Sequence, residues 1–260
     1  MKIVACVRQT PDTETIVKIA DNKTSIKTDD IKYIIGPYDE YSLEAAVQIK
    51  DEAKGEVTVL SMGPNRVPET LRACLARGAD SAVHISTGDE EIDDALVVAS
   101  ALAAQVKKMG QVDVVFTSTK GSDSDRGAVS PMLAELLGLP YLGLVSEIQV
   151  ADGKFECKRQ VEGGIVESFT VSTPAVLCLE QGVRGQARYP SLMQIMKAKK
   201  KKIETVDFAS LGVDAALNKV EIETLEYPPE RPPGRIIDGD SLDAKLDELV
   251  RLLKEEAKVL

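Results

Sequence analysis

The chain has 260 residues, of which 43% are hydrophobic and only 4% are aromatic, with no Trp. This composition predicts a sizeable aliphatic core and excludes wholesale disorder, and the length suits one large domain with an extension. The formal net charge of −10 argues against nucleic-acid binding, which needs a basic face.

The four cysteines, Cys6, Cys74, Cys157 and Cys178, lie far apart and form no CxxC pair. This spacing argues against a metal or iron–sulfur site. The apolar run at residues 1–7 has the character of a strand and is too short for a signal peptide. Because no stretch approaches the length of a membrane span, we expect a soluble cytoplasmic protein.

Short apolar runs alternate with helical patterns between Met1 and Pro140. The alternation predicts βαβ units and an α/β fold, in which a parallel sheet carries helices on both faces. We expect Asp39 or Ser42 to cap the first helix. The predicted strands are 3–7, 56–61, 81–86 and 112–118, and the predicted helices are 39–54, 67–77, 93–109 and 129–138.

The pattern changes after Pro140 to a period near two, which is typical of antiparallel strands. We divide the chain into an α/β domain at 1–190 that includes these strands, a segment at 191–204 and a C-terminal arm at 205–260. The expected elements are strands at 145–150, 154–162, 165–173 and 175–180, turns at Asp152-Gly153 and Gly163-Gly164, a helix at 191–202, an extended Pro-rich linker at 228–233 and an amphipathic helix at 241–258.

Ligands of parallel sheets bind beyond the carboxyl ends of the strands, which here are residues 8–12, 61–64 and 118–127. In the last of these loops, Gly127 lets the backbone approach an anion and Arg126 could add a charge-assisted contact. The alternative interpretation is a polar turn in which Asp125 caps the next helix. The turn around Gly63 suits a passing ribose or phosphate, or is an ordinary βα turn.

A basic run at Lys197 and 199–202 stands out on this acidic chain. It is either a solvated helix end or a docking patch for an acidic partner. The apolar residues just before it, Leu192, Met193, Ile195 and Met196, favour an interface. The single histidine, His84, lies in mid-strand, and pairs such as Asp93-Asp94 resemble a solvated helix start. The sequence therefore contains segments suited to binding, namely the loops at the strand ends and the apolar and basic segment, but it contains no recognisable set of catalytic residues.

Several segments together resemble the electron transfer flavoprotein β subunit family. The strongest is residues 188–204, RYPSLMQIMKAKKKKIE, and the second combines residues 62–64, 69–72 and 76–80. The third, similar to the family's hairpin signature, is Arg159, residues 162–164, Glu167 and residues 174–176, although Cys157 and Phe169 depart from the usual residues there. The resemblance runs from residue 1 to about residue 255.

The resemblance implies a heterodimer with an electron transfer flavoprotein α subunit, which holds most of the electron-carrying FAD. Such proteins accept electrons from dehydrogenases such as acyl-CoA dehydrogenase and pass them to a membrane-associated quinone-linked oxidoreductase. The β subunit would contribute an adenine nucleotide α-hydrolase-like domain that holds AMP, or a second FAD in electron-bifurcating members. The chain would be an electron carrier and would have no catalytic residues of its own.

By position, the resemblance assigns a nucleotide pocket and a partner-binding segment at 191–204, and it implies that the C-terminal arm at 205–260 packs on the α subunit. Leu192 would be the apolar anchor of the partner-binding segment, and Tyr38 would face the subunit interface and the flavin. The pocket would use Cys6, Val7, Pro37, Tyr38, Asp39, Met62, Gly63, Asp123, Asp125, Arg126, Gly127, Ala128, Val129 and Ser130, and the partner would contact Leu192, Lys197, Lys199 and Lys200.

The phosphate loop departs from the family pattern. AMP-binding members often carry Asn-Gln-Thr-Gly where this chain has residues 127–130, and Arg126 and Ala128 replace a usual Thr and Gln. The Asp-x-Asp frame is closer to members that carry FAD, so AMP and FAD both stay open, with FAD favoured. Two other classes remain: a nucleotide-binding stress or sensor protein, and an enzyme acting on an adenylated substrate. The first does not explain the hairpins, the basic run and the arm, and the lack of a plausible nucleophile, metal site or general base counts against the second.

Overall fold

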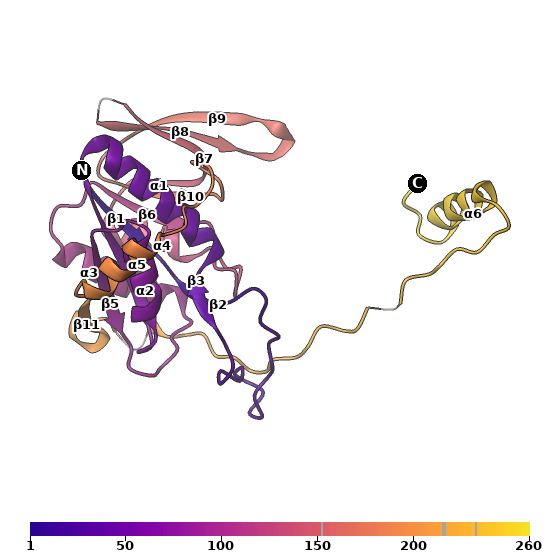
Figure 1. The fold of residues 1–260 in the computed structure, drawn as a ribbon, viewed down its shortest axis with the longest axis horizontal. Helices are drawn as coiled ribbons and strands as arrows, with labels where there is room; N and C mark the ends of the chain where they lie inside the picture. Colours follow the sequence, from indigo (N-terminus) through magenta and orange to yellow (C-terminus); the bar gives the residue numbers. More distant parts are fainter. Residues whose placement is uncertain (152, 215–216, 232) are drawn as a thin grey trace. The chain divides into compact units, whose positions relative to one another are not determined.

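The computed structural model describes residues 1–151, 153–214, 217–231 and 233–260. It divides into two compact units, Met1–Glu223 and Thr224–Leu260. The larger unit is built on a nine-stranded sheet with the order β11-β5-β4-β1-β6-β10-β7-β8-β9 (Figure 1). Its strands are parallel from β11 to β7 and antiparallel from β7 to β9. The predicted α/β fold with a mainly parallel sheet and a hairpin extension is confirmed.

The strands of this sheet are short except for β7, which is long enough to pair with β10 at one end and β8 at the other. A separate two-stranded sheet, β2 with β3, lies in the segment after β1 that we expected to be a loop. The strands are β1 (Lys2–Cys6), β2 (Gln9–Pro11), β3 (Tyr33–Ile35), β4 (Glu56–Gly63), β5 (Ser81–Ser86), β6 (Val114–Ser118), β7 (Tyr141–Ala151), β8 (Lys154–Gln160), β9 (Val166–Ser172), β10 (Ala175–Leu179) and β11 (Glu204–Asp207).

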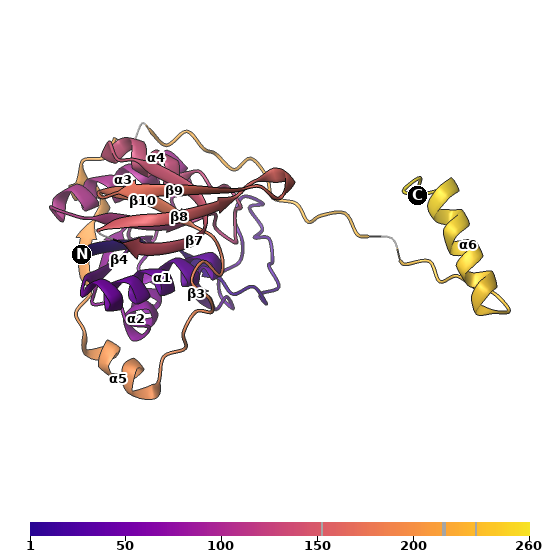
Figure 2. The same cartoon turned by 90° about the horizontal axis from the view of Figure 1, so that it is seen from above.

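Helices cover both faces of the sheet, which is why the central strands are buried throughout (Figure 2). Ile3 and Ala5 of β1 face a core shared with α1, α2 and α5, whereas Val4 and Cys6 face the core of α3 and α4. The helices of the larger unit are α1 (Pro37–Ala53), α2 (Val67–Ala76), α3 (Ala95–Lys108), α4 (Val129–Leu137) and α5 (Leu192–Lys200), with short 3-10 turns at Glu162–Gly164 and Phe208–Leu211.

The prediction for residues 175–180 was wrong in one respect. They form β10, but this strand is parallel and lies between β6 and β7, rather than in the antiparallel hairpin. Every residue of Ala175–Leu179 is buried, whereas burial in β9 alternates along the strand. A continuous apolar run is the mark of a strand covered on both faces. The other three predicted strands do form the antiparallel extension β7-β8-β9.

The predicted cap of the first helix was also wrong. The helix begins earlier than expected, at Pro37, and Gly36 at its N-cap has no side-chain capping bond. Residues 205–223, which we expected to begin the C-terminal arm, contain the end of the edge strand β11 and the 3-10 turn after it. Asp152 of the predicted Asp152-Gly153 turn lies outside the described residues.

The smaller unit, Thr224–Leu260, contains helix α6 (Leu242–Glu255), which the Ser241 hydroxyl caps. Its Leu242, Leu246 and Leu249 side chains are exposed, as an unpartnered amphipathic face would be. The preceding Pro-rich stretch has no regular secondary structure where it is described, and residue 232 lies outside the described residues. Within the described part of the chain, no helix combines the length and the apolar character that crossing a membrane requires.

Candidate functional site: the carboxyl edge of the sheet and the surface of α5

The loops predicted to bind a ligand lie at one edge of the sheet. Strand β1 lies between β4 and β6, with Cys6 opposite Leu60 and Ala5 opposite Phe116. Because the three strands are parallel, their carboxyl ends meet, and the loops that follow them are neighbours. This edge therefore brings together Cys6 and Val7 after β1, Met62 and Gly63 in β4, and the loop after β6.

Asp39 joins these loops from the first turn of α1. Its buried carboxylate accepts hydrogen bonds from the Arg8 backbone N–H, at 2.8 Å, and from the Ser118 hydroxyl, at 2.5 Å. Burial raises the pKa of Asp39 to about 7, although hydrogen bonds from Ser118 and Arg8 act against that rise. Asp39 therefore ties the ends of β1 and β6 together instead of capping its own helix.

Two arginines lie over this edge, each paired with aspartates. The Arg8 guanidinium is 2.8 Å from Asp123 and 3.8 Å from Asp93. Arg126 donates to the Asp93 carboxylate and to its carbonyl oxygen, both at 2.6 Å. Sequence reasoning identified Arg126 and Asp123, but it placed Asp93 on a solvated helix start. Asp93 precedes α3 whereas Arg126 follows β6, so the two lie far apart in the chain and no local signal marks the pair.

The loop after β6 leads into α4 without a capping side chain. The N-cap is Ala128, which has no side chain able to accept the first amides of α4. The alternative prediction that Asp125 caps this helix was wrong, because its carboxylate accepts from the Lys120 ammonium at 2.7 Å. The same ammonium lies 5.6 Å from the centre of the Tyr38 ring. Ser130 donates its hydroxyl to the Ser118 carbonyl oxygen.

Two glycines let the backbone approach a ligand at this edge. Gly127 has a φ of 60°, and a Cβ there would lie 3.0 Å from the Thr119 carbonyl oxygen. Gly63 has a φ of 149° and would meet Val67 at the same distance. The buried His84 ring supports this second turn, because its Nε2 lies 2.8 Å from the Gly63 carbonyl oxygen. Open backbone amides beside two guanidinium groups fit a phosphate group.

Cys6 is a neutral thiol at this edge. Its burial, together with the charge of Asp39, raises its pKa to about 12. A thiolate is the nucleophilic form of cysteine, so Cys6 is unsuited to covalent chemistry near neutral pH. Its side chain packs in the core shared with α3 and α4.

Helix α5 forms a second surface, on another part of the molecule. We call α5 surface the exposed side chains of this helix, whose apolar members Leu192 and Met193 are 77% and 67% exposed. Within α5 only Ala198 is buried, against the core beneath α2. The polar contacts of α5 reach Arg72 of α2 rather than the loop after β6. The α5 surface comprises Leu192, Met193, Ile195, Met196, Lys197, Lys199 and Lys200.

These features define an α/β protein that has a mainly parallel sheet, two arginines and two glycine turns at the carboxyl edge of that sheet, and an exposed apolar and basic helix. The electron transfer flavoprotein domain matches residues 24–211. The chain is 33% identical over 262 residues to an electron transfer flavoprotein subunit beta of Bacillus subtilis, covering 100% of both chains. The same subunit of Mus musculus is 32% identical over 256 residues, covering 97% of this chain and 99% of the relative.

The chain therefore belongs to the electron transfer flavoprotein family, as a β subunit that acts as an electron carrier. The family is flavin-linked, and a β subunit implies an α-subunit partner. A relative from Arabidopsis thaliana, 32% identical over 268 residues and covering 100% of both chains, is named as mitochondrial. Because these relatives match the chain over its full length, no observation favours the alternative of a stress or sensor protein.

Proposed function

We propose that this chain and an α subunit form a cytoplasmic heterodimer that accepts electrons from dehydrogenases such as an acyl-CoA dehydrogenase. The heterodimer passes them to a membrane-associated quinone-linked oxidoreductase. The electron-carrying FAD is held mostly by the α subunit, with Tyr38 directed toward it. The observation that carries the proposal is the α5 surface, where apolar side chains stand exposed beside lysines on a chain of net charge −10.

The composition of the α5 surface suits a transient partner. Leu192, at the first position of the helix, is its apolar anchor, because a mostly exposed leucine gains binding energy when a partner buries it. Lys197, Lys199 and Lys200 add a local positive charge that steers an acidic dehydrogenase toward the helix. Electron transfer needs fast association and release, and a small patch of this kind provides both.

We propose that the carboxyl edge of the sheet binds the adenine nucleotide portion of AMP or of a second FAD. The amides at the start of α4 and the Gly127 backbone would hold a phosphate, and Arg126 would exchange Asp93 for it. Arg8, which Asp123 and Asp93 now hold, would lie beside the same group. The Asp-x-Asp frame at 123–125 favours FAD, and a second flavin would supply redox chemistry with NADH and permit bifurcation.

The test of this pocket is to count cofactors. The chain is co-expressed with its α subunit, the pure heterodimer is denatured, and FAD and AMP are quantified by chromatography. Two FAD per heterodimer and no AMP would establish the second-flavin form, and one of each would establish the AMP form. A stable heterodimer that releases one FAD and no AMP would refute the pocket.

The test of the α5 surface is Leu192→Ala, with Val220→Ala as a control that shortens a different exposed apolar side chain. The loss of a buried leucine contact predicts a roughly tenfold or larger rise in KM for the heterodimer in dehydrogenase turnover. The heterodimer and its nucleotide content should stay intact in both variants. Equal KM values for the two variants would refute α5 as the docking surface.

A further inference from the structure

Helix α5 has little hydrophobic anchorage of its own, because Ala198 is its single buried residue. It has nine residues, and a helix of that length is marginal in isolation. Most surface helices compensate by burying an apolar face, but α5 buries only Ala198 and turns Leu192 and Met196 to solvent. Its own capping box, Ser191 with Gln194, satisfies the first turn but does not attach the helix to the body. Polar contacts on either side of the helix add to the single buried residue.

The chain entering α5 is held by a partly buried ion pair between Arg188 and Glu44, which we call the N-terminal clamp. Arg188 donates from its backbone N–H at 3.0 Å and from its guanidinium at 2.8–3.1 Å to the Glu44 carboxylate of α1. Only 6% of the Glu44 side chain is exposed. Burial opposes the ionisation of Glu44, but the bonds from Arg188 and Gln48 together outweigh it and lower its pKa.

The chain leaving α5 is held by a second set of contacts, the C-terminal clamp. The Lys201 ammonium donates to the carbonyl oxygens of Ala79 and Asp80, at 2.8 and 3.1 Å. Arg72 of α2 donates to the Lys199 and Lys201 carbonyl oxygens, at 3.1 and 3.4 Å. Cations bound to the last carbonyls of a helix also stabilise its dipole.

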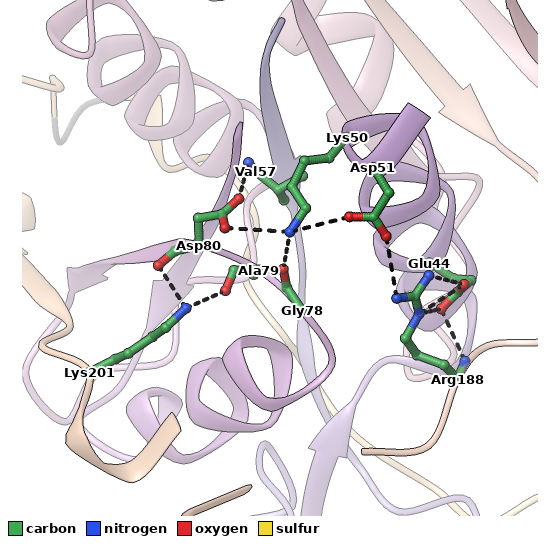
Figure 3. Close-up of polar contacts among 9 residues, drawn as sticks. All are labelled: Glu44, Lys50, Asp51, Val57, Gly78, Ala79, Asp80, Arg188 and Lys201. Carbon is green, nitrogen blue, oxygen red and sulfur yellow. Dashed lines mark hydrogen bonds and ion pairs between the residues drawn. The ribbon is translucent and has the colours of Figure 1, made fainter. Parts of the chain in front are cut away.

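A line of polar contacts joins the two clamps across α1, as Figure 3 shows. Asp51 lies 3.7 Å from Arg188 and 3.8 Å from the Lys50 ammonium. Lys50 donates to the Gly78 carbonyl oxygen at 2.8 Å and lies 3.4 Å from the Asp80 carboxylate. Asp80 in turn accepts from the Val57 backbone N–H at the start of β4. The two ends of the 188–201 segment are thus fixed to the same part of the rigid body.

We propose that the two clamps are a positioning device that holds α5 in its docking conformation before a partner arrives. The proposal rests on the docking function of the α5 surface and adds residues that would not touch the partner. Without the clamps, a partner would have to order a short, unanchored helix, and the cost would appear as weaker binding. Lys201 is therefore distinct from Lys199 and Lys200, although all three belong to one basic run.

The structure supplies a matched pair of variants for the test. Lys201→Ala and Lys202→Ala each remove one positive charge at adjacent positions, but Lys202 has no polar partner among the described residues. In the purified heterodimer, hydrogen exchange over residues 189–200 should accelerate roughly tenfold in Lys201→Ala and stay unchanged in Lys202→Ala. Equal exchange in the two variants would overturn the proposal.

Kinetics separate positioning from charge. With an acyl-CoA dehydrogenase and its acyl-CoA as electron source, Lys201→Ala should raise KM roughly fivefold beyond Lys202→Ala, with kcat unchanged. Faster exchange with an unchanged KM, in an assay where Leu192→Ala does raise KM, would overturn positioning while leaving α5 as the docking surface. No effect of Leu192→Ala would overturn the docking function itself, and the exchange data would still show whether the clamp holds α5.

The N-terminal clamp needs a different design, because Arg188→Gln alone would leave a buried carboxylate unpaired and could unfold the chain. The double variant Glu44→Gln/Arg188→Gln removes both charges and keeps neutral groups that can hydrogen-bond. It should accelerate exchange over residues 189–200 and leave the α3 and α4 peptides unchanged. Protection equal to the wild-type heterodimer would overturn the role of this ion pair.

Discussion

Asp39 should make the stability of this chain depend on pH in a direction opposite to that of most carboxylates. The pKa of its carboxyl rises from 3.8 to about 7 in the folded protein, chiefly because the group is buried. The unfolded chain loses this proton near pH 4, whereas the folded chain keeps it until about pH 7. The folded state therefore binds more protons in that window, and stability falls as the pH rises through it.

The magnitude follows from the shift. About three pKa units correspond to about 4 kcal/mol between pH 4 and pH 7, or about 1.4 kcal/mol for each pH unit. Asp39→Asn removes the titration but retains an acceptor for the Arg8 N–H and an amide that can donate to Ser118. The unfolding free energy of the variant, relative to wild type, should therefore increase from pH 4 to pH 7.

The assay is urea unfolding of the chain at several pH values between 4 and 8. Asp30→Asn, at an exposed position in the loop before β3, serves as the control and should track the wild type. The diagnostic quantity is the slope of the difference in unfolding free energy between Asp39→Asn and wild type. A difference that does not change with pH would show that Asp39 is ionised in the folded protein at pH 5, and the reasoning from burial would be wrong.

Two further predictions concern the nucleotide edge and the hairpin extension. Arg126→Gln should lower nucleotide affinity roughly tenfold to a hundredfold, because a charge-assisted phosphate contact is lost. Equilibrium dialysis of the heterodimer measures this affinity, with Arg235→Gln in the smaller unit as the control. Equal affinity in the two variants would remove Arg126 from the site. Phe155→Ala should destabilise the chain by about 3–5 kcal/mol, because this fully buried β8 side chain packs edge-to-face on Phe116 of β6, 5.9 Å between ring centres. A loss below about 1 kcal/mol in urea unfolding would mean that the extension is not part of the central core.

The fold was predictable where a local pattern had only one physical solution. Alternating apolar runs and helical patterns between Met1 and Pro140 imply parallel βαβ units, and the structure has them. The strand at Ala175–Leu179 was found but misplaced, because the chain order after β9 suggested one more hairpin. Its pairing with β6 and β7 shows that it returns to the middle of the sheet, and its complete burial agrees with that position. The short strands β2 and β3 carry no pattern that separates them from a loop.

Sequence alone determined the class of fold, the family and the segments that carry its signature, because these depend on local periodicity and on residues contiguous in the chain. Only the tertiary structure decided how distant residues pair. Asp93 meets Arg126, Asp39 binds the ends of two strands, and Glu44 of α1 holds Arg188 just before α5. The energy of such contacts depends on burial and distance in three dimensions, and neither is encoded in the spacing of the residues along the chain.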